Sequence, residues 1–157
     1  ENLTSRLSGD YDIYVYTVKS EFKLSSLSYN NSNIILVPMN ANGFQSIFYD
    51  FLTMLHAVMK SADLILVLGV SGGIFFPLFR LFRGRIILNP DGSEWKRSKF
   101  SYIAKLFLKL SENIGVRFSD HVITDNTVIE KEIKKNYDIN SSVIEYGADH
   151  VRHVNSN

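Results

Sequence analysis

The chain has 157 residues, of which 45% are hydrophobic and 21% charged, a composition typical of one folded globular domain with a hydrophobic core. Its formal net charge of +1 lacks the basic excess of most nucleic-acid-binding proteins, so no nucleic-acid partner is expected. The sequence contains no cysteine, which excludes disulfide and thiolate chemistry, and residues 1–10 lack a secretory signal pattern. Both features favour the cytoplasm.

The N-terminal part of the chain predicts two strands followed by a long helix. Residues 1–7 indicate the last turns of a helix, and the β-branched and aromatic residues 12–18 indicate a strand. The polar residues 19–32 are typical of a loop or a weak helix. A second strand is expected at 34–39, and apolar residues then recur at helical spacing over residues 44–59.

The middle of the chain is apolar from Leu64 to Phe82, which is close to the length of a membrane span. Several glycines interrupt this run, so a membrane span is the weaker interpretation. We predict instead a buried strand at 64–68, a glycine turn and a short buried helix at 74–82. The strand is apolar on both faces, which is typical of a central strand in a parallel sheet.

The C-terminal part predicts strands at 85–88, 121–124 and 142–145. A long amphipathic helix is expected to begin near Lys99 and end near Phe118. Its apolar face is predicted to contain Ile103, Leu106, Phe107, Leu110 and Ile114. Asn126 is a suitable cap for another helix that extends to Tyr137. That helix is predicted to turn three lysines to solvent, namely Lys131, Lys134 and Lys135.

Strands that alternate with helices predict right-handed βαβ units and a parallel sheet covered by helices on both faces. The expected fold class is therefore α/β, a doubly wound, Rossmann-like sheet. We expect one such domain over residues 1–157. Because this fold normally opens with a strand and a ligand-facing turn, its first strand is expected upstream of Glu1.

The segment from Asn89 to Arg97 carries the strongest functional signal. It follows the strand at 85–88 and precedes the long helix, so it is expected at the carboxyl edge of the sheet, where open α/β sheets bind ligands. It contains two carboxylates (Asp91 and Glu94), two cations and the only tryptophan, Trp95. A turn needs less hydrogen-bonding capacity, so the segment predicts a polar ligand site.

A glycine turn follows the strand at 64–68. The backbone N–H groups of Gly69, Ser71 and Gly72 either bind an anion or a hydroxyl group, or they form only a tight strand-to-helix turn. The turn lacks both the Gly-Lys-Ser/Thr of a phosphate-binding loop and the dinucleotide-binding spacing, so no cofactor is expected. The four histidines show no metal-ligand spacing, so no metal site is expected either.

Five groups of residues, spread over nearly the whole chain, occur in an order that resembles the N-terminal domain of rhamnosyltransferase-type family 4 glycosyltransferases, a GT-B family. The most specific group is Asp91-Gly92-Ser93-Glu94-Trp95-Lys96-Arg97 together with Asn89 before it. The other groups are 38–43 with Gln45-Ser46, 68–72, Asp125-Asn126 and 146–150. Pro90 departs from the β-branched residue expected at that position and leaves the carboxylates in place.

This resemblance implies an enzyme with two Rossmann-like domains that face a cleft. The N-terminal domain mainly binds the acceptor, and a C-terminal domain mainly binds the nucleotide sugar. The chain would be the acceptor-side domain of a hexosyltransferase that makes a bacterial surface polysaccharide. Rhamnose from dTDP-rhamnose is the implied donor sugar, and a lipid-linked saccharide is the implied acceptor. By this pattern a glycine loop precedes Glu1 and a second domain follows Asn157, and this chain alone is expected to be inactive.

Each site residue implied by the resemblance also has a simpler explanation. Asp91 is expected to orient the acceptor and Glu94 to bind its hydroxyl groups, yet acidic residues at a helix start are also common helix caps. Trp95 either stacks on a sugar or fills the core. Lys96 and Arg97 either bind the diphosphate of a lipid-linked acceptor or lie on a solvated, ion-paired surface.

Two alternatives to a transferase remain open. The chain is then either a carbohydrate- or nucleotide-binding domain without chemistry of its own, or part of another GT-B enzyme such as a nucleotide-sugar epimerase. A further expectation is peripheral contact with the inner face of a membrane. The residues that suggest this contact are Phe75, Phe76, Phe79, Arg80, Phe82 and Arg83.

Overall fold

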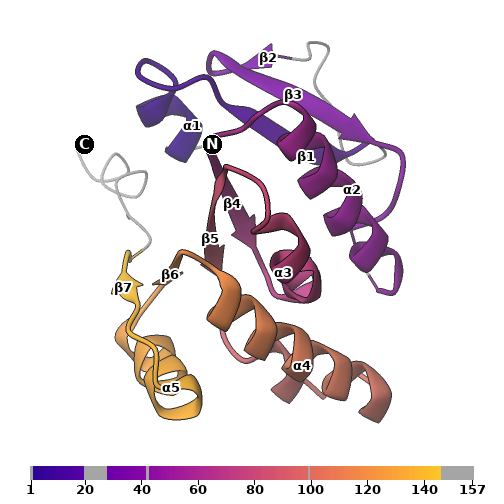
Figure 1. The fold of residues 1–157 in the computed structure, drawn as a ribbon, viewed down its shortest axis with the longest axis vertical. Coiled ribbons are helices and arrows are strands. Elements are labelled where there is room, and N and C mark those ends of the chain that lie inside the picture. Colours follow the sequence, from indigo (N-terminus) through magenta and orange to yellow (C-terminus); the bar gives the residue numbers. More distant parts are fainter. Residues whose placement is uncertain (1, 20–27, 42, 99, 146–157) are drawn as a thin grey trace, which may run out of the picture. The chain divides into compact units, whose positions relative to one another are not determined.

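The computed structural model describes residues 2–19, 28–41, 43–98 and 100–145 (Figure 1). The chain divides into two compact units, Glu1–His56 and Ala57–Asn157. Each unit contains its own sheet, and the division falls in the last turn of helix α2. No helix in the described part of the chain combines the length and the hydrophobicity that a membrane span requires.

The first unit has a three-stranded sheet with β3 in the middle. Its elements are α1 (Asn2–Leu7), β1 (Tyr14–Val18), β2 (Ser28–Tyr29), β3 (Ser32–Val37) and α2 (Gln45–Met59). Strand β3 pairs in parallel with β1 and antiparallel with β2. The buried residues Val18, Ile34 and Val37 come from β1 and β3.

Strand β2 and its hairpin with β3 correct the expectation of a loop or weak helix at 19–32. Asn30 and Asn31 connect the two strands with φ angles of 48° and 56°. Two consecutive positive φ angles define the two-residue type I′ turn, which asparagine tolerates and which matches the twist of paired strands. The Asn-Asn pair was the available sequence signal for this hairpin. Residues 20–27 lie outside the described part of the chain.

The second unit has a four-stranded, fully parallel sheet in the order β4-β5-β6-β7. Its strands are β4 (Leu64–Leu68), β5 (Arg85–Asn89), β6 (His121–Thr124) and β7 (Ser142–Val143). The connecting elements are the 3-10 helix η1 (Ser71–Phe75), α3 (Phe76–Phe79), the 3-10 helix η2 (Glu94–Lys96), α4 (Tyr102–Phe118) and α5 (Thr127–Tyr137). Helix α4 contacts η1, η2, α3 and α5.

This architecture confirms the α/β, Rossmann-like fold class. The predicted bounds of β4 and β6 match the structure, and the strand predicted at 85–88 extends to Asn89. Asn126 caps α5 as predicted, since its side chain accepts hydrogen bonds from the N–H groups of Val128 and Ile129, each at 3.0 Å. The three α5 lysines are exposed, also as predicted.

Two predictions for the apolar middle of the chain were wrong in detail. Strand β4 is an end strand of its sheet in the described part of the chain, not a central one. The prediction failed because an apolar sequence does not reveal whether both edges of a strand are paired. The predicted buried helix at 74–82 is a short 3-10 helix followed by the four residues of α3. Phe76 and Phe79 are buried, whereas Leu81 and Phe82 are exposed.

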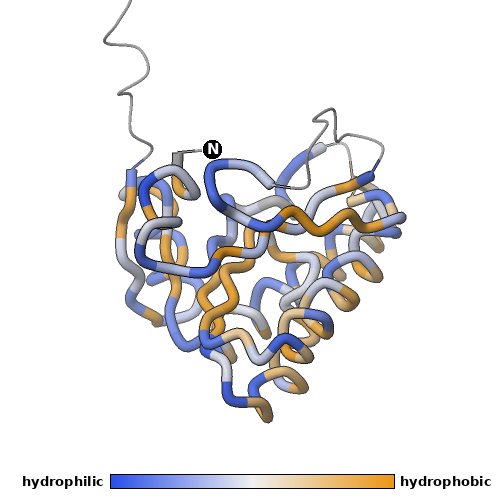
Figure 2. The backbone as a smooth tube through the Cα atoms, turned by 90° about the horizontal axis from the view of Figure 1, so that it is seen from above, coloured by the Kyte–Doolittle hydropathy of each residue, from blue (hydrophilic) through white to orange (hydrophobic). Residues whose placement is uncertain are grey.

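The buried face of α4 also differs from the prediction. Ile103, Leu106 and Leu110 are exposed. The residues that face the interior are Leu108, Ser111, Glu112, Gly115 and Val116. Figure 2 shows how hydrophobic and hydrophilic residues alternate along the backbone of the helices.

The orientation of α4 follows from its close contact with the glycine turn. A Cβ atom built on Gly73 would lie 2.3 Å from the carbonyl oxygen of Ser111, and one on Gly115 would lie 3.2 Å from the Cα of Gly73. Only glycine permits this approach of two backbones. The small residues of α4 therefore face inward, although larger apolar residues lie on its other side.

Candidate functional site

The side chain of Asn89 links the carboxyl ends of neighbouring parallel strands. This residue is buried at the end of β5. Its backbone carbonyl oxygen accepts a hydrogen bond from the N–H of Gly69, which follows β4, at 2.8 Å. Its side-chain Nδ2 donates to Oδ1 of Asp125, which follows β6, also at 2.8 Å. Backbone and side chain of this one residue thus connect three neighbouring strand ends at the edge where parallel sheets bind ligands.

Asp91 occupies this edge in an unusual backbone conformation. Its φ angle is +50°, a left-handed value that few residues other than glycine adopt, and Gly92 follows with a φ of +77°. The Asp91 N–H donates to Oδ1 of Asn89 at 3.0 Å, which holds the turn in place. Such left-handed residues concentrate at functional sites, where surrounding contacts maintain them.

The carboxylate of Asp91 remains open to solvent. Its side chain is 53% exposed, and its Oδ2 lies 3.7 Å from Nη2 of Arg97. An exposed pair at this distance contributes little to stability. The carboxylate therefore retains the capacity to accept charge-assisted hydrogen bonds from hydroxyl groups.

Helix α5 anchors the rest of the segment through Glu132. Ser93 Oγ donates to Oε2 of Glu132 at 2.7 Å, and Lys96 Nζ donates to Oε1 at 2.8 Å. The hydrogen bond from Lys96, and then that from Ser93, hold the pKa of Glu132 below its ordinary value. Lys96 is therefore ion-paired within the protein, as the simpler sequence interpretation proposed. This contact fixes η2 against α5.

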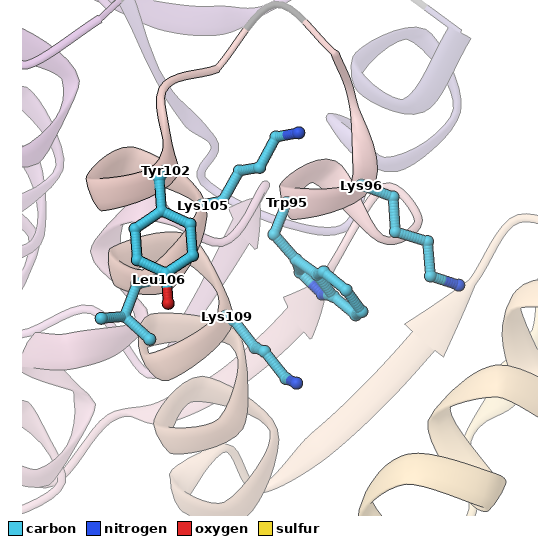
Figure 3. Close-up of a pocket in the computed structure, with 6 residues that line it drawn as sticks. All are labelled: Trp95, Lys96, Tyr102, Lys105, Leu106 and Lys109. Carbon is cyan, nitrogen blue, oxygen red and sulfur yellow. The ribbon is translucent and has the colours of Figure 1, made fainter.

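Trp95 and Lys96 line a shallow pocket of about 420 Å³ between η2 and the start of α4. Helix α4 contributes Tyr102, Lys105, Leu106 and Lys109, as Figure 3 shows. The ammonium groups of Lys96 and Lys109 lie 5.3 Å and 5.0 Å from the centroid of the Trp95 ring, within the range of cation–π attraction. The pocket therefore combines an indole surface with positive charge.

Behind the pocket, Glu112 forms a buried polar cluster with Tyr137 and Trp95. Glu112 is 1% exposed, and its Oε1 accepts a hydrogen bond from the Tyr137 hydroxyl group at 2.6 Å. Burial raises the pKa of Glu112 and of Tyr137. Oε2 of Glu112 and Nε1 of Trp95 are buried without a partner of hydrogen-bond geometry in the described residues, although the nearby indole lowers the pKa of Glu112.

The glycine turn uses its N–H groups within the protein. Gly69 has a φ of +97° and donates to Asn89. The N–H of Gly73 donates to the carbonyl oxygen of Val70 at 3.1 Å, and that of Ile74 donates to Oγ of Ser111 at 3.0 Å. Ser111 Oγ also donates to the carbonyl oxygens of Val70 and Ser71. The N–H of Gly69 is therefore engaged within the protein, and the contacts of Gly73, Ile74 and Ser111 hold the turn tightly against α4.

The structure thus brings five of the predicted site residues together in two groups. Gly69, Asn89 and Asp91 meet at the carboxyl edge, and Trp95 and Lys96 line the pocket. Ser71 and Gly72 lie in η1, where Gly72 is buried. Arg97 pairs with Asp91, and Glu94 begins η2.

Sequence reasoning missed the contributions of α4 and α5 to these places. Lys105 and Lys109 are one helical turn apart, a spacing that could have indicated a shared surface. The role of Glu132 had no local signal, because it contacts Ser93 and Lys96 across more than 35 positions of the sequence.

No group of three or more histidine or acidic side chains in the described part of the chain is arranged to hold a metal ion. His56 contacts the hydroxyl group of Tyr16 through Nδ1 at 2.9 Å, and His121 contacts Ser142. His150 and His153 lie outside the described residues, as do residues 146–150 of the family-like pattern.

Comparison with known proteins supplies a family and no activity. A search of curated proteins found no match to this chain. A family model described as a domain of unknown function, DUF1972, matches residues 4–149. The match covers nearly the whole chain, including the Asn89–Arg97 segment and the polar edge around it. The protein therefore belongs to the DUF1972 family.

Proposed function

We propose that this chain is the acceptor-binding side of a sugar transferase, in which Asp91 orients an acceptor hydroxyl group. The observation that carries the proposal is the geometry of Asp91. Its left-handed backbone is held by Asn89, and its carboxylate is half-exposed at the carboxyl edge of a parallel sheet.

The chemistry suits recognition of a hydroxyl group. A carboxylate held in one position accepts a charge-assisted hydrogen bond from a sugar hydroxyl and thereby fixes the orientation of the attacking oxygen. Arg97, 3.7 Å away, adds a donor for a second polar group of the acceptor. Lys105 and Lys109, which line the pocket beside Trp95, add positive charge suited to the phosphate groups of a lipid-linked saccharide.

The identity of the sugars rests on the resemblance to rhamnosyltransferase-type family 4 enzymes. That resemblance points to rhamnose from dTDP-rhamnose as the donor. The nucleotide sugar would bind mainly to a second domain, and bond formation would need both domains. The chain described here would bind the acceptor and orient its hydroxyl group.

The test is the substitution Asp91→Asn in the complete protein, because asparagine also tolerates the left-handed conformation and removes only the charge. Transfer of sugar from dTDP-rhamnose to a lipid-linked saccharide should fall at least about tenfold, which corresponds to about 1.4 kcal/mol. Unchanged transfer by a folded variant would refute the role of Asp91.

Asp138→Asn provides a matched control. Asp138 is also an aspartate with a positive φ (56°), and its Oδ1 pairs with Lys134 at 2.8 Å. It ends α5 and has no place at the carboxyl edge. The control should therefore retain full activity. A complete protein that binds the saccharide and transfers no sugar would favour the alternative of a binding domain without chemistry.

A further inference from the structure

Helix α4 carries a second apolar face that nothing in the described part of the second unit covers. This outward stripe consists of Tyr102, Ile103, Leu106 and Leu110, with exposures between 50% and 82%. At 100° per residue, the stripe lies nearly opposite the buried face that contains Ser111 and Gly115. A surface helix normally presents polar residues on its outer side.

The basic residues of α4 reach the surface of the protein, whereas its acidic residue does not. Its three cations are Lys105, Lys109 and Arg117, and its only acidic residue, Glu112, is buried. Lys109 and Arg117 are exposed, and Lys105 is half-buried at the edge of the Trp95 pocket. Figure 3 shows Tyr102 and Leu106 on successive turns of α4, with Lys105 and Lys109 beside Trp95. Every exposed charge on this helix is therefore positive.

We propose that the outward face of α4 docks on an anionic lipid bilayer. The apolar side chains of the stripe would enter the boundary between headgroups and acyl chains, and the α4 cations would contact lipid phosphates. This combination of apolar and basic residues on one helix is the pattern of interfacial helices. Lysine and arginine can bury their aliphatic stems at such a boundary and keep their charged ends in the headgroup layer.

A protein partner fits this surface less well. Lysine is depleted at the centres of protein–protein interfaces, where its desolvation is costly. The stripe has lysines along its flank and no exposed carboxylate on its own helix to neutralise them. Attraction to negative phosphates explains both features.

The membrane contact predicted from residues 75–83 is less suitable. Phe76 and Phe79 are buried, so they cannot enter a bilayer. Arg80 is already bound to the carbonyl oxygen of Phe118 at 3.2 Å and lies 3.6 Å from the carboxylate of Asp120. An anion within the patch would oppose binding to an acidic surface, and α4 presents none.

The test is co-sedimentation of the protein with vesicles, which requires no sugar substrate and therefore does not depend on the proposed transferase function. The unmodified protein should bind vesicles of equal parts phosphatidylglycerol and phosphatidylcholine at low salt. It should not bind vesicles of phosphatidylcholine alone, and high salt should weaken the binding. Absence of binding to the acidic vesicles at low salt would overturn the proposal.

Two double variants locate the contact. Lys105→Gln with Lys109→Gln should weaken binding about 30-fold, which is the expected effect of removing two basic residues at an anionic surface. Lys131→Gln with Lys135→Gln removes the same charge from the exposed side of α5 and should weaken binding much less. Equal losses from both pairs would show that only the net charge matters and would overturn the assignment to α4.

The apolar contribution needs its own variant. Ile103→Ser with Leu110→Ser should abolish most binding, and circular dichroism should show that the exposed substitutions leave the fold intact. Val128→Ser with Ile144→Ser, also at exposed apolar positions, is the matched control. If the unmodified protein instead forms dimers that only the stripe variant disrupts, and if it ignores vesicles, the stripe is an interface between copies and the proposal is wrong.

Discussion

At the scale of single residues, two glutamates illustrate how environment sets opposite pH behaviour. Glu132 receives hydrogen bonds from Lys96 and Ser93, which lower its pKa, so its contribution to stability exists above the ordinary value of 4.5 and is lost in acid. Glu112 is buried, and burial raises its pKa. Its contribution is complete below 4.5 and is lost as the pH rises through the raised value.

Substitution of Glu112 by glutamine should therefore stabilise the protein near neutral pH. Glutamine keeps the shape and an acceptor for the Tyr137 hydroxyl group, and it carries no charge that burial penalises. The difference in free energy of unfolding between variant and parent should shrink as the pH falls from the raised pKa of Glu112 toward 4.5, and the penalty of the buried charge should be absent below 4.5. Urea unfolding at neutral and acidic pH measures this difference.

The alanine variant separates charge from packing. Glu112→Ala removes the acceptor and leaves a cavity beside Tyr137, so it should cost about 2–4 kcal/mol in acid, where the parent carboxyl is protonated. If glutamine destabilises the protein as much as alanine does at neutral pH, the Glu112 carboxylate is held ionised by partners, and our account of this cluster is wrong.

At the scale of elements, the contact between η1 and α4 fixes the orientation of the longest helix. Gly73→Ala should destabilise the second unit by about 2 kcal/mol or more, because its Cβ would lie 2.3 Å from the backbone oxygen of Ser111 and the backbones must separate. Gly9→Ala is the matched control. A Cβ at Gly9 meets nothing within 4 Å, and the backbone there is not left-handed.

Thermal unfolding of the two variants measures the difference. The control should stay within about 0.5 kcal/mol of the parent. Equal stability of both variants would mean that α4 can move away from η1 at little cost. The exposure of the stripe on α4 would then no longer follow from this contact.

The contact between η1 and α4 also shows where prediction of the fold from sequence ends. The predicted bounds of β4, a continuous apolar run, and of the short strand β6 match the structure to the residue, and Asn126 marked the start of α5. The face of α4 was not predictable in this way, because a local pattern counts apolar residues and cannot register the backbone approach of Gly73 and Gly115. Long-range contacts decide which of two apolar faces is buried.

The candidate site, like the fold, was predictable from local sequence patterns and not from long-range contacts. The position of the Asn89–Arg97 segment at the carboxyl edge was predictable from the order of strand, loop and helix. The link from Asn89 to Asp125 and the anchor of Lys96 on Glu132 join residues 36 positions apart, and no local pattern pairs them. Sequence reasoning therefore located the segment and could not identify the partners that hold it.

At the scale of the whole molecule, the division into two compact units has a measurable consequence. The only tryptophan, Trp95, belongs to the second unit, so its fluorescence reports the unfolding of that unit alone. Circular dichroism reports the helices and strands of both. Two compact units are expected to unfold in separate transitions, whereas a single cooperative domain gives coincident curves for all probes.

We therefore predict that urea unfolding is biphasic by circular dichroism and has a single phase by tryptophan fluorescence. A core substitution in each unit assigns the phases, because loss of a buried aliphatic side chain costs about 2–5 kcal/mol. Leu88→Ala, at a fully buried position of β5, should shift the fluorescence midpoint, and Ile34→Ala, at a buried position of β3, should leave it unchanged while it shifts the other phase. If both substitutions shift one common transition, the two units unfold together and the prediction is wrong.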